Sequence, residues 1–126
     1  MTVEEAISAA ESILPGHAAP DGEIDPRWQA IIAVGDYIPT DPEAVWEFAR
    51  TWGCHPQADL RAAIATCLLE HLLQHHFVAM FPRVERLSER DALFAETVQW
   101  CAKFGQAEEP SNAARFDALC GRLRRK

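Results

Sequence analysis

The residues of this sequence best suited to chemistry lie close together in one stretch of the chain. That stretch contains a thiol, a carboxylate and three imidazoles: Cys67, Glu70, His71, His75 and His76. On a helix, which turns about 100° per residue, Cys67, His71 and His75 fall along one line. His71 and His75 are four residues apart, the spacing at which two helical histidines can both reach one zinc ion. A site for zinc or another divalent metal is therefore one hypothesis for this segment.

The same spacing limits the hypothesis. Cys67 and His75 are separated by roughly 12 Å of helix rise, whereas two ligands of one zinc lie within about 4 Å of each other. Further ligands, such as His55 or Cys101, would have to come from other segments, and nothing in the sequence selects them. The alternative is that these histidines end a buried helix and bond to neighbouring carbonyl groups or face water.

Other chemistry has little support in the sequence. It contains no G-x-S-x-G nucleophile motif, no glycine-rich phosphate loop and no C-x-x-C pair. The four cysteines, three of them in apolar stretches, are expected to be buried free thiols: Cys54, Cys67, Cys101 and Cys120. We therefore expect a protein that is not an enzyme and, apart from the metal hypothesis, has no cofactor.

Charge and aromatic residues favour a protein partner. The net charge is −7, and residues 1–49 hold ten acidic residues against one base, Arg27. This balance argues against nucleic-acid binding and suits a basic protein partner. Tryptophans near these acids can be core residues or interface anchors. The candidate binding residues are Trp28, Trp46, Trp52, Asp36, Glu47 and Glu70.

The N-terminal stretch has no signal-peptide pattern, because Glu4, Glu5 and Glu11 interrupt it. No window approaches the roughly 20 apolar residues of a membrane helix. We expect a cytoplasmic protein with no membrane contact. The sequence does not indicate its oligomeric state.

Helix signals cover almost the whole chain. Thr2, with Glu5 three residues later, predicts a capped helix over 2–14. Asp-Pro pairs at 25–26 and 41–42 predict two further helix starts, since proline is favoured at the first helical position. Leucines and alanines at helical spacing predict a buried central helix over 57–76.

The second half continues in the same way. Apolar residues from Phe77 onward predict another helix, in which Pro82 is expected to cause a kink or a new start. A helix over 91–104 should end at Gly105, and Ser111 should cap a last helix over 111–126. No alternating strand pattern is present. The prediction is one all-α domain, residues 1–126, with about six to seven helices.

The central helix carries a family resemblance. Asp59-Leu60-Arg61-Ala62-Ala63-Ile64-Ala65, followed by paired leucines, resembles the HEAT-repeat pattern. The stretches Leu-Leu-Glu-His-Leu-Leu and Phe-Pro-Arg-Val-Glu are similar to small bacterial proteins of this helical-repeat type, which imply no particular activity. No second clean copy of acid-x-Arg-Ala-Ala is present.

The resemblance implies an α-α superhelix, a HEAT-like stack of antiparallel helical pairs. Residues 1–14 would be an N-terminal capping helix, 25–105 the HEAT-like core and 111–126 a C-terminal helix. The motif arginine would reach the preceding acid or a neighbouring helix end. We therefore expect a non-enzymatic protein-interaction module, for example an inhibitor or immunity-like protein, with a metal-binding protein using His71 and His75 as the alternative.

Overall fold

The computed structural model describes residues 1–125, which form helices and no strands. The prediction of an all-α protein is confirmed. The helices are α1 (Val3–Glu11), α2 (Pro26–Gly35), α3 (Pro42–Trp52), α4 (Ala58–Ile64), α5 (Glu70–Arg90), α6 (Ala92–Gln99) and α7 (Pro110–Arg124), with a π-helical turn η1 (Ala65–Leu69) and a 3₁₀ turn η2 (Gly105–Glu108). Residue 126, the last of the predicted C-terminal helix, lies outside the described residues.

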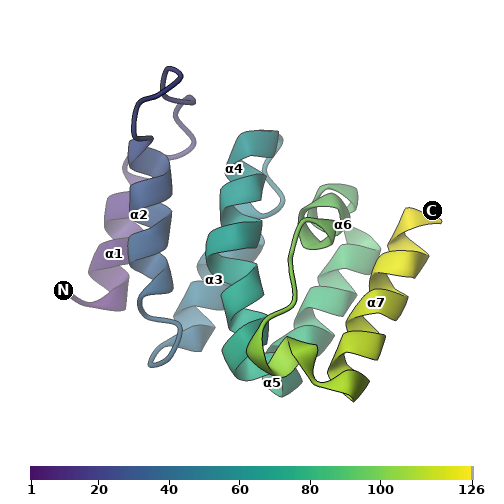
Figure 1. Cartoon of the computed structure of the whole chain (residues 1–126). Coiled ribbons are helices and arrows are strands. Elements are labelled where there is room, and N and C mark those ends of the chain that lie inside the picture. The colour runs from purple at the N-terminus through teal and green to yellow at the C-terminus, as the bar shows by residue number, and fades with distance from the viewer. Residues whose placement is uncertain (126) are drawn as a thin grey trace.

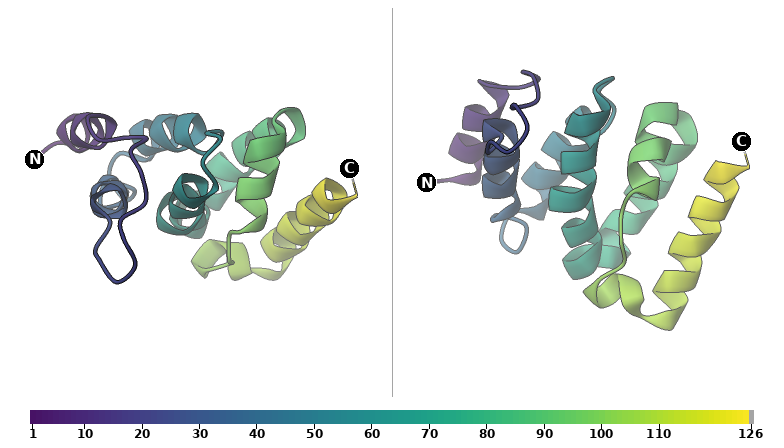
Figure 2. Two further views of the ribbon diagram at one scale, coloured as in Figure 1. Left: turned by 90° about the horizontal axis from the view of Figure 1, so that it is seen from above. Right: turned by 45° about the horizontal axis from the view of Figure 1, so that its top comes forward.

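Helices that follow one another in the chain run in opposite directions from α1 to α4 (Figure 1). Seen from above, α1 and α3 lie in one row, and α2 and α4 lie in a second row (Figure 2). The second half of α5 packs against α6 and α7 at the other end of the molecule. No helix within residues 1–125 has both the length and the apolar character needed to span a bilayer.

The predicted helix starts in the first half are largely correct. Thr2 accepts a bond from the Glu5 N–H, and the Glu5 carboxylate accepts one from the Thr2 N–H, which completes the capping box. Asp25 caps α2 by accepting from the Arg27 N–H. Asp41 stands at the cap of α3 but makes no such side-chain bond. Helix α1 ends at Glu11, earlier than predicted.

The central helix is a continuous rod formed by α4, η1 and the first part of α5. Its leucines are fully buried, as predicted for a helix apolar on most sides: Leu60, Leu68, Leu69, Leu72 and Leu73. The rod ends at His76, whose backbone (φ −139°, ψ 46°) is not helical. The Phe77 N–H then donates to the side-chain oxygen of Gln106 at 2.9 Å. Gln106 therefore satisfies the donor that the kink frees.

The expected kink at Pro82 is wrong, because α5 continues through this residue without a non-helical backbone. Proline removes the hydrogen bond to the carbonyl four residues earlier, here that of Val78. Val78 is 78% exposed. This part of α5 therefore faces solvent, and the helix continues through the proline.

Two other boundaries differ from the predictions. Helix α6 ends at Gln99 rather than near Phe104, and residues 100–104 run alongside the central rod (Figure 1). Gly105 begins η2 with φ +52°, and a Cβ there would lie 2.7 Å from Gln74 Cγ. Only glycine fits this left-handed, crowded position. Pro110 is the first residue of α7 after Glu109, so Ser111 does not cap that helix.

Two buried arginines each connect a helix to the next helix but one. Arg27, at the start of α2, bonds to Asp25 and reaches Asp59 of α4 at 2.5 Å. Arg61 of α4 reaches Glu96 of α6 at 2.6 Å and donates to the carbonyl groups of His55 and Pro56. The motif arginine thus bonds to a neighbouring helix rather than to Asp59, the acid two residues before it.

Candidate functional site

A pocket of about 260 Å³ lies between α2 and the π-helical turn. Its lining contains three of the residue types singled out in the sequence, a carboxylate, a thiol and an imidazole. We call it the α2–η1 pocket, and it is lined by Ile32, Gly35, Asp36, Thr66, Cys67 and His71. The structure therefore brings Asp36, Cys67 and His71 to one place, although they come from segments 30 residues apart.

The shape of the pocket depends on Gly35 and on η1. A Cβ on Gly35 would lie 3.1 Å from the Cys67 carbonyl oxygen and 3.3 Å from Leu68 Cδ2, so glycine lets α2 approach the rod closely. The π-helical turn widens the rod at the same level, and Thr66 bonds back to the Ala62 carbonyl. Single π-helical turns occur often at functional sites.

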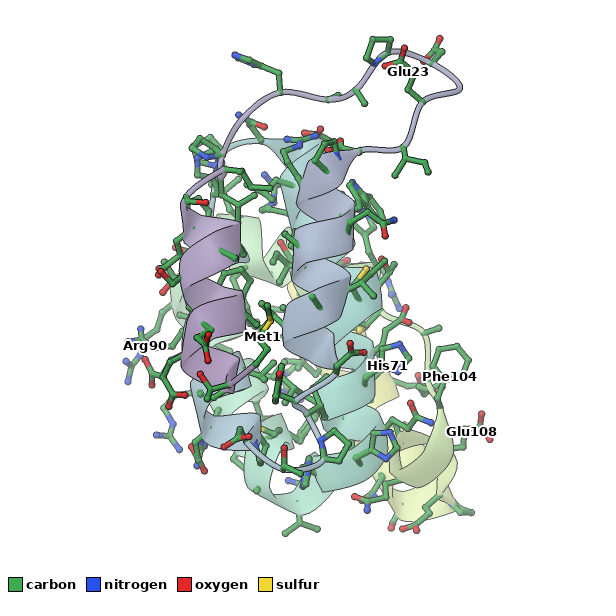
Figure 3. The ribbon with its side chains drawn as sticks, turned by 90° about the vertical axis from the view of Figure 1, so that its left-hand side faces the viewer. Met1, Glu23, His71, Arg90, Phe104 and Glu108 are labelled. Atoms are coloured by element: carbon green, nitrogen blue, oxygen red, sulfur yellow. The ribbon has the colours of Figure 1, made fainter. Side chains whose placement is uncertain are left out.

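His71 is held by two neighbours on this side of the molecule (Figure 3). Its ring stacks on Phe104, with ring centroids 6.2 Å apart and an interplanar angle of 12°. Its Nδ1 is 2.7 Å from the side-chain oxygen of Gln74. Because an amide oxygen only accepts, this contact requires a proton on Nδ1.

His75 does not join His71 in the pocket. Its ring lies edge-on to His76, 6.5 Å away, and His76 donates from Nε2 to the Ile38 carbonyl at 3.0 Å. The line predicted through Cys67, His71 and His75 assumes regular α-helix, and the π-helical turn that contains Cys67 alters this phase. Within residues 1–125, no group of three or more His, Cys, Asp or Glu side chains is placed to hold a metal ion.

Glu70 is buried, with 7% of its surface exposed, rather than displayed to a partner. Its carboxylate accepts a bond from the Ala102 N–H at 2.9 Å. The Cys101 thiol also contacts the Ala65 carbonyl. These contacts fix residues 100–104 along the rod, so Glu70 positions the segment that carries Phe104.

The three candidate tryptophans do not form one surface cluster. Trp46 is 6% exposed and packs edge-to-face against Phe94. Trp52 is half-buried between Phe48 and His55, and Trp28 is half-buried on α2. Glu47 pairs with Arg50 at 2.7 Å on the surface. Of the predicted binding residues, only Asp36 lines the α2–η1 pocket.

Three exposed apolar residues were not among the sequence candidates: one lines the pocket, one stacks on His71, and one lies at the start of the segment that follows α6. Ile32 is 45% exposed, and Phe104 and Trp100 are each 40% exposed. The guanidinium of Arg61 lies over the Trp100 ring, 5.4 Å from its centroid, in a cation–π contact. We define the α2–α4 face as the α2–η1 pocket together with Trp100 and Phe104. Trp100 and Phe104 fall in an apolar stretch that the sequence predicts to be helical, so their exposure could not be predicted from the sequence.

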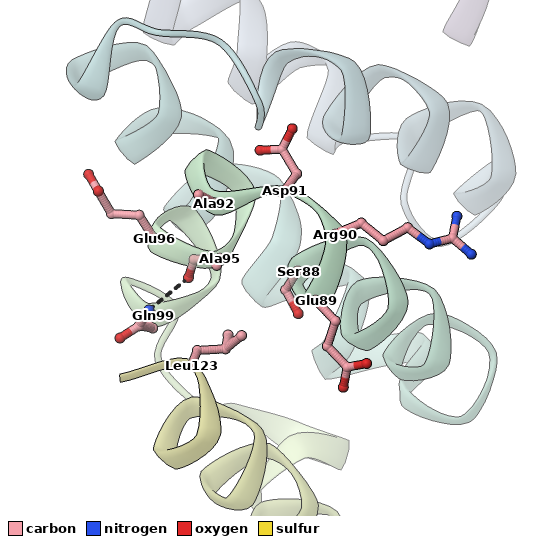
Figure 4. A pocket seen from close by; sticks show the side chains of 9 residues that line it. All are labelled: Ser88, Glu89, Arg90, Asp91, Ala92, Ala95, Glu96, Gln99 and Leu123. Carbon is pink, nitrogen blue, oxygen red and sulfur yellow. Dashed lines mark hydrogen bonds between the residues drawn. The ribbon is translucent and has the colours of Figure 1, made fainter. Parts of the chain in front are cut away.

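A larger cleft of about 440 Å³ lies between the end of α5, α6 and α7 (Figure 4). Its acidic rim is already used by the fold. Asp91 caps α6 through the Phe94 N–H, Glu96 binds Arg61, and Glu89 binds Arg122 at 3.3 Å. These side chains stabilise helix ends and helix pairs, so the cleft is a less favourable candidate than the α2–η1 pocket.

None of the four cysteines is an activated nucleophile. Burial raises the pKa of the Cys67, Cys101 and Cys120 thiols above the usual value. Burial, with a smaller contribution from Asp91, raises the pKa of Cys54 to about 11. The thiolate is the reactive form, so all four side chains are held in the inert state at neutral pH.

Alkylation of Cys54 by iodoacetamide is expected to be about 100-fold slower at pH 8 than that of an unperturbed thiol, because a pKa shift of two units reduces the thiolate fraction by that factor. Peptide-resolved mass spectrometry from pH 7 to 11 measures the rate. The rate should rise steadily across this range. Asp91→Asn, which keeps a capping side chain, should increase the alkylation rate of Cys54 several-fold. A rate that reaches a plateau near pH 9 would contradict the assigned pKa.

The α2–α4 face therefore combines a small pocket, a stacked imidazole, exposed apolar side chains and one exposed carboxylate. Among residues 1–125, no hydrogen bond or ion pair joins Asp36 to His71. Comparison of the chain with protein-family models, with curated proteins and with solved structures gave no match.

Proposed function

We propose that this protein is a non-enzymatic interaction module that binds a basic protein partner on its α2–α4 face. Ile32 and Phe104 carry this proposal, because they expose apolar surface on either side of a pocket. Exposed apolar groups gathered around a concavity are typical of interaction sites, and aromatic side chains are favoured anchors. The partner would insert an apolar side chain into the pocket and cover Trp100 and Phe104.

The preference for a basic partner rests on charge. Asp36 is exposed at the pocket, where the lining contains no lysine or arginine. Arg27, the base nearest in sequence, is buried against Asp25 and Asp59. A basic side chain next to the partner's apolar anchor would therefore meet an uncompensated carboxylate. An inhibitor or immunity-like protein for a basic target is one role of this kind.

We also propose that the fold is a HEAT-like stack. Asp25-Pro26-Arg27 and Asp59-Leu60-Arg61 share the same acid-x-Arg spacing near the starts of α2 and α4, although Asp25 is the cap of α2 and Asp59 is the second residue of α4. In each, the arginine is buried and reaches an acid of a later helix: Asp59 for Arg27, and Glu96 for Arg61. Repeated couplings between neighbouring pairs support a repeat architecture, in which each unit is stabilised by the next.

Affinity capture from cells that make this protein tests the proposed function. The wild-type chain should retain a partner of high isoelectric point. Asp36→Lys should weaken its binding at least about tenfold, since like charges would meet in a desolvated contact. Ile32→Asp should do the same by placing a charge where an apolar group is buried.

Two variants serve as matched controls. Glu11→Lys makes the same charge change at an exposed position of α1, and Val78→Asp makes the same polar change at an exposed position of α5. Both should bind nearly as well as the wild type. Equal weakening by Glu11→Lys and Asp36→Lys would mean that net charge alone controls binding, and capture of acidic partners only would overturn the proposal.

A further inference from the structure

Four arginines gather on the opposite side of the molecule from the α2–α4 face. They come from α3 and α5 and surround a pocket of about 180 Å³ whose wall is formed by an indole and a leucine. The lining residues are Trp46, Arg50, Arg83, Arg86, Leu87 and Arg90. Figure 3 places Arg90 on one side of the molecule and His71 and Phe104 on the other. A third of the twelve lysines and arginines of this acidic chain therefore meet at one pocket.

Two of these arginines are partly neutralised by glutamates of α3. Arg83 pairs with both carboxylate oxygens of Glu43, and Arg50 pairs with Glu47 at 2.7 Å. The hydrogen bonds between Arg83 and Glu43 raise the pKa of Arg83 above its ordinary value and lower the pKa of Glu43 below its ordinary value. The pairs hold the two guanidinium groups at the edge of the pocket.

Arg86 and Arg90 differ from the other two. They lie four residues apart on one face of α5, both are exposed, and within residues 1–125 neither side chain has an ion-pair or hydrogen-bond partner. Like charges at this spacing on a helix are destabilising. Each guanidinium also has several N–H donors in a planar fork that fits the oxygens of an anion. An anion bridging Arg86 and Arg90 would remove this repulsion.

We propose that this pocket binds the phosphate group of an organic phosphate monoester. A phosphate dianion offers three acceptor oxygens, enough for forks from two arginines, whereas a carboxylate offers two. The adjacent Leu87 side chain and the small exposed edge of the Trp46 indole supply apolar surface for the organic part of the ester. The small volume and the chain's overall negative charge fit a single phosphate group better than a polyanion, which the rest of the surface would repel. The site is separate from the proposed partner face.

Titration of the full-length protein with phenyl phosphate at pH 8 tests this proposal. Calorimetry gives the affinity, and the indole N–H signal of Trp46 in NMR spectra reports on the pocket. Saturable binding with a dissociation constant of about 1 mM or tighter, with movement of the Trp46 signal, is expected. The absence of saturable binding would overturn the proposal.

Two double variants separate a site from a general charge effect. Arg86→Gln with Arg90→Gln should weaken binding at least about tenfold, because it removes charge-assisted bonds to the phosphate. Arg124→Gln with Arg125→Gln removes the same charge from two exposed positions, the last residue of α7 and its C-cap, and should leave binding unchanged. Equal weakening in both would overturn the assignment. All four residues are exposed, and unchanged thermal unfolding would verify that each variant is folded.

Three ligand comparisons identify the chemistry. Benzoate carries the same ring with a carboxylate and should bind at least about tenfold more weakly than phenyl phosphate, since it lacks the third oxygen. Inorganic phosphate should also bind more weakly, because it leaves the Trp46 and Leu87 wall uncovered. A tyrosine-phosphorylated peptide distinguishes a phosphoprotein from a small ester as the source. Equal affinity for benzoate, or for inorganic phosphate, would contradict a phosphate-ester site.

Discussion

Arg61→Ala is expected to lower the free energy of unfolding by about 3 kcal/mol, since three hydrogen bonds and a fully packed side chain are lost. The Arg61 side chain is 2% exposed, and it donates to the His55 and Pro56 carbonyls and to Glu96. Removing it leaves two carbonyls near the start of α4 without their donor and a space beneath Trp100. Urea denaturation followed by circular dichroism measures the change.

The matched control is Arg50→Ala, which breaks an arginine–glutamate pair on the surface. Both side chains of that pair are about half exposed, so the expected cost is less than about 1 kcal/mol. Glu96→Gln should also have a small effect, because Glu96 is 55% exposed and water can replace its contact. Similar losses for Arg61→Ala and Arg50→Ala would contradict a structural role for the buried arginine.

Arg27→Ala should have a similar cost, about 3 kcal/mol at neutral pH, and should also change the response to acid. The Arg27 side chain is 4% exposed and ties α2 to the loop before it and to α4, through the Pro15 carbonyl, Gln57 and Asp59. Its hydrogen bonds are the main reason that the pKa values of Asp25 and Asp59 lie below their ordinary values.

The pH dependence follows from the direction of these shifts. A carboxylate whose pKa is lower in the folded protein adds stability that is fully present well above pH 4 and is lost as the pH falls through the folded-state pKa. The difference in free energy of unfolding between the wild type and Arg27→Ala should therefore be greatest at neutral pH and become smaller below about pH 4. Denaturation curves from pH 2.5 to 7 measure it. Asp59→Asn should remove part of this pH dependence. A stability difference between wild type and Arg27→Ala that stays constant at every pH would contradict the coupling of Arg27 to these carboxylates.

Local signals in the sequence predict much of this fold. The capping box at Thr2 and the Asp25-Pro26 start depend on residues within one turn of each other, and both are confirmed. The buried central rod follows from the density of its apolar positions. The break at His76 could not be predicted in this way, because the donor freed there, the Phe77 N–H, is capped by Gln106, 29 residues later.

The candidate site was predictable only in part. Asp36, Cys67 and His71 were identified by residue type, and they do line one pocket. The alignment of Cys67 with His75 assumed a regular α-helix. That assumption is wrong at the π-helical turn, which no local sequence pattern predicts. Phe104 and Trp100 lie at the surface because α6 ends at Gln99, and the Glu70 contact that fixes the following residues is long-range.

The most direct test of the proposed function is site-specific photocrosslinking in cells that make the protein. A benzophenone amino acid replaces Phe104 on the α2–α4 face in one variant, and Val78 on α5 in the other; both positions are exposed. We predict a covalent adduct with one basic protein from position 104 and none from position 78. An adduct from position 78 alone, or none from either position, would contradict the assignment of the α2–α4 face as the partner surface.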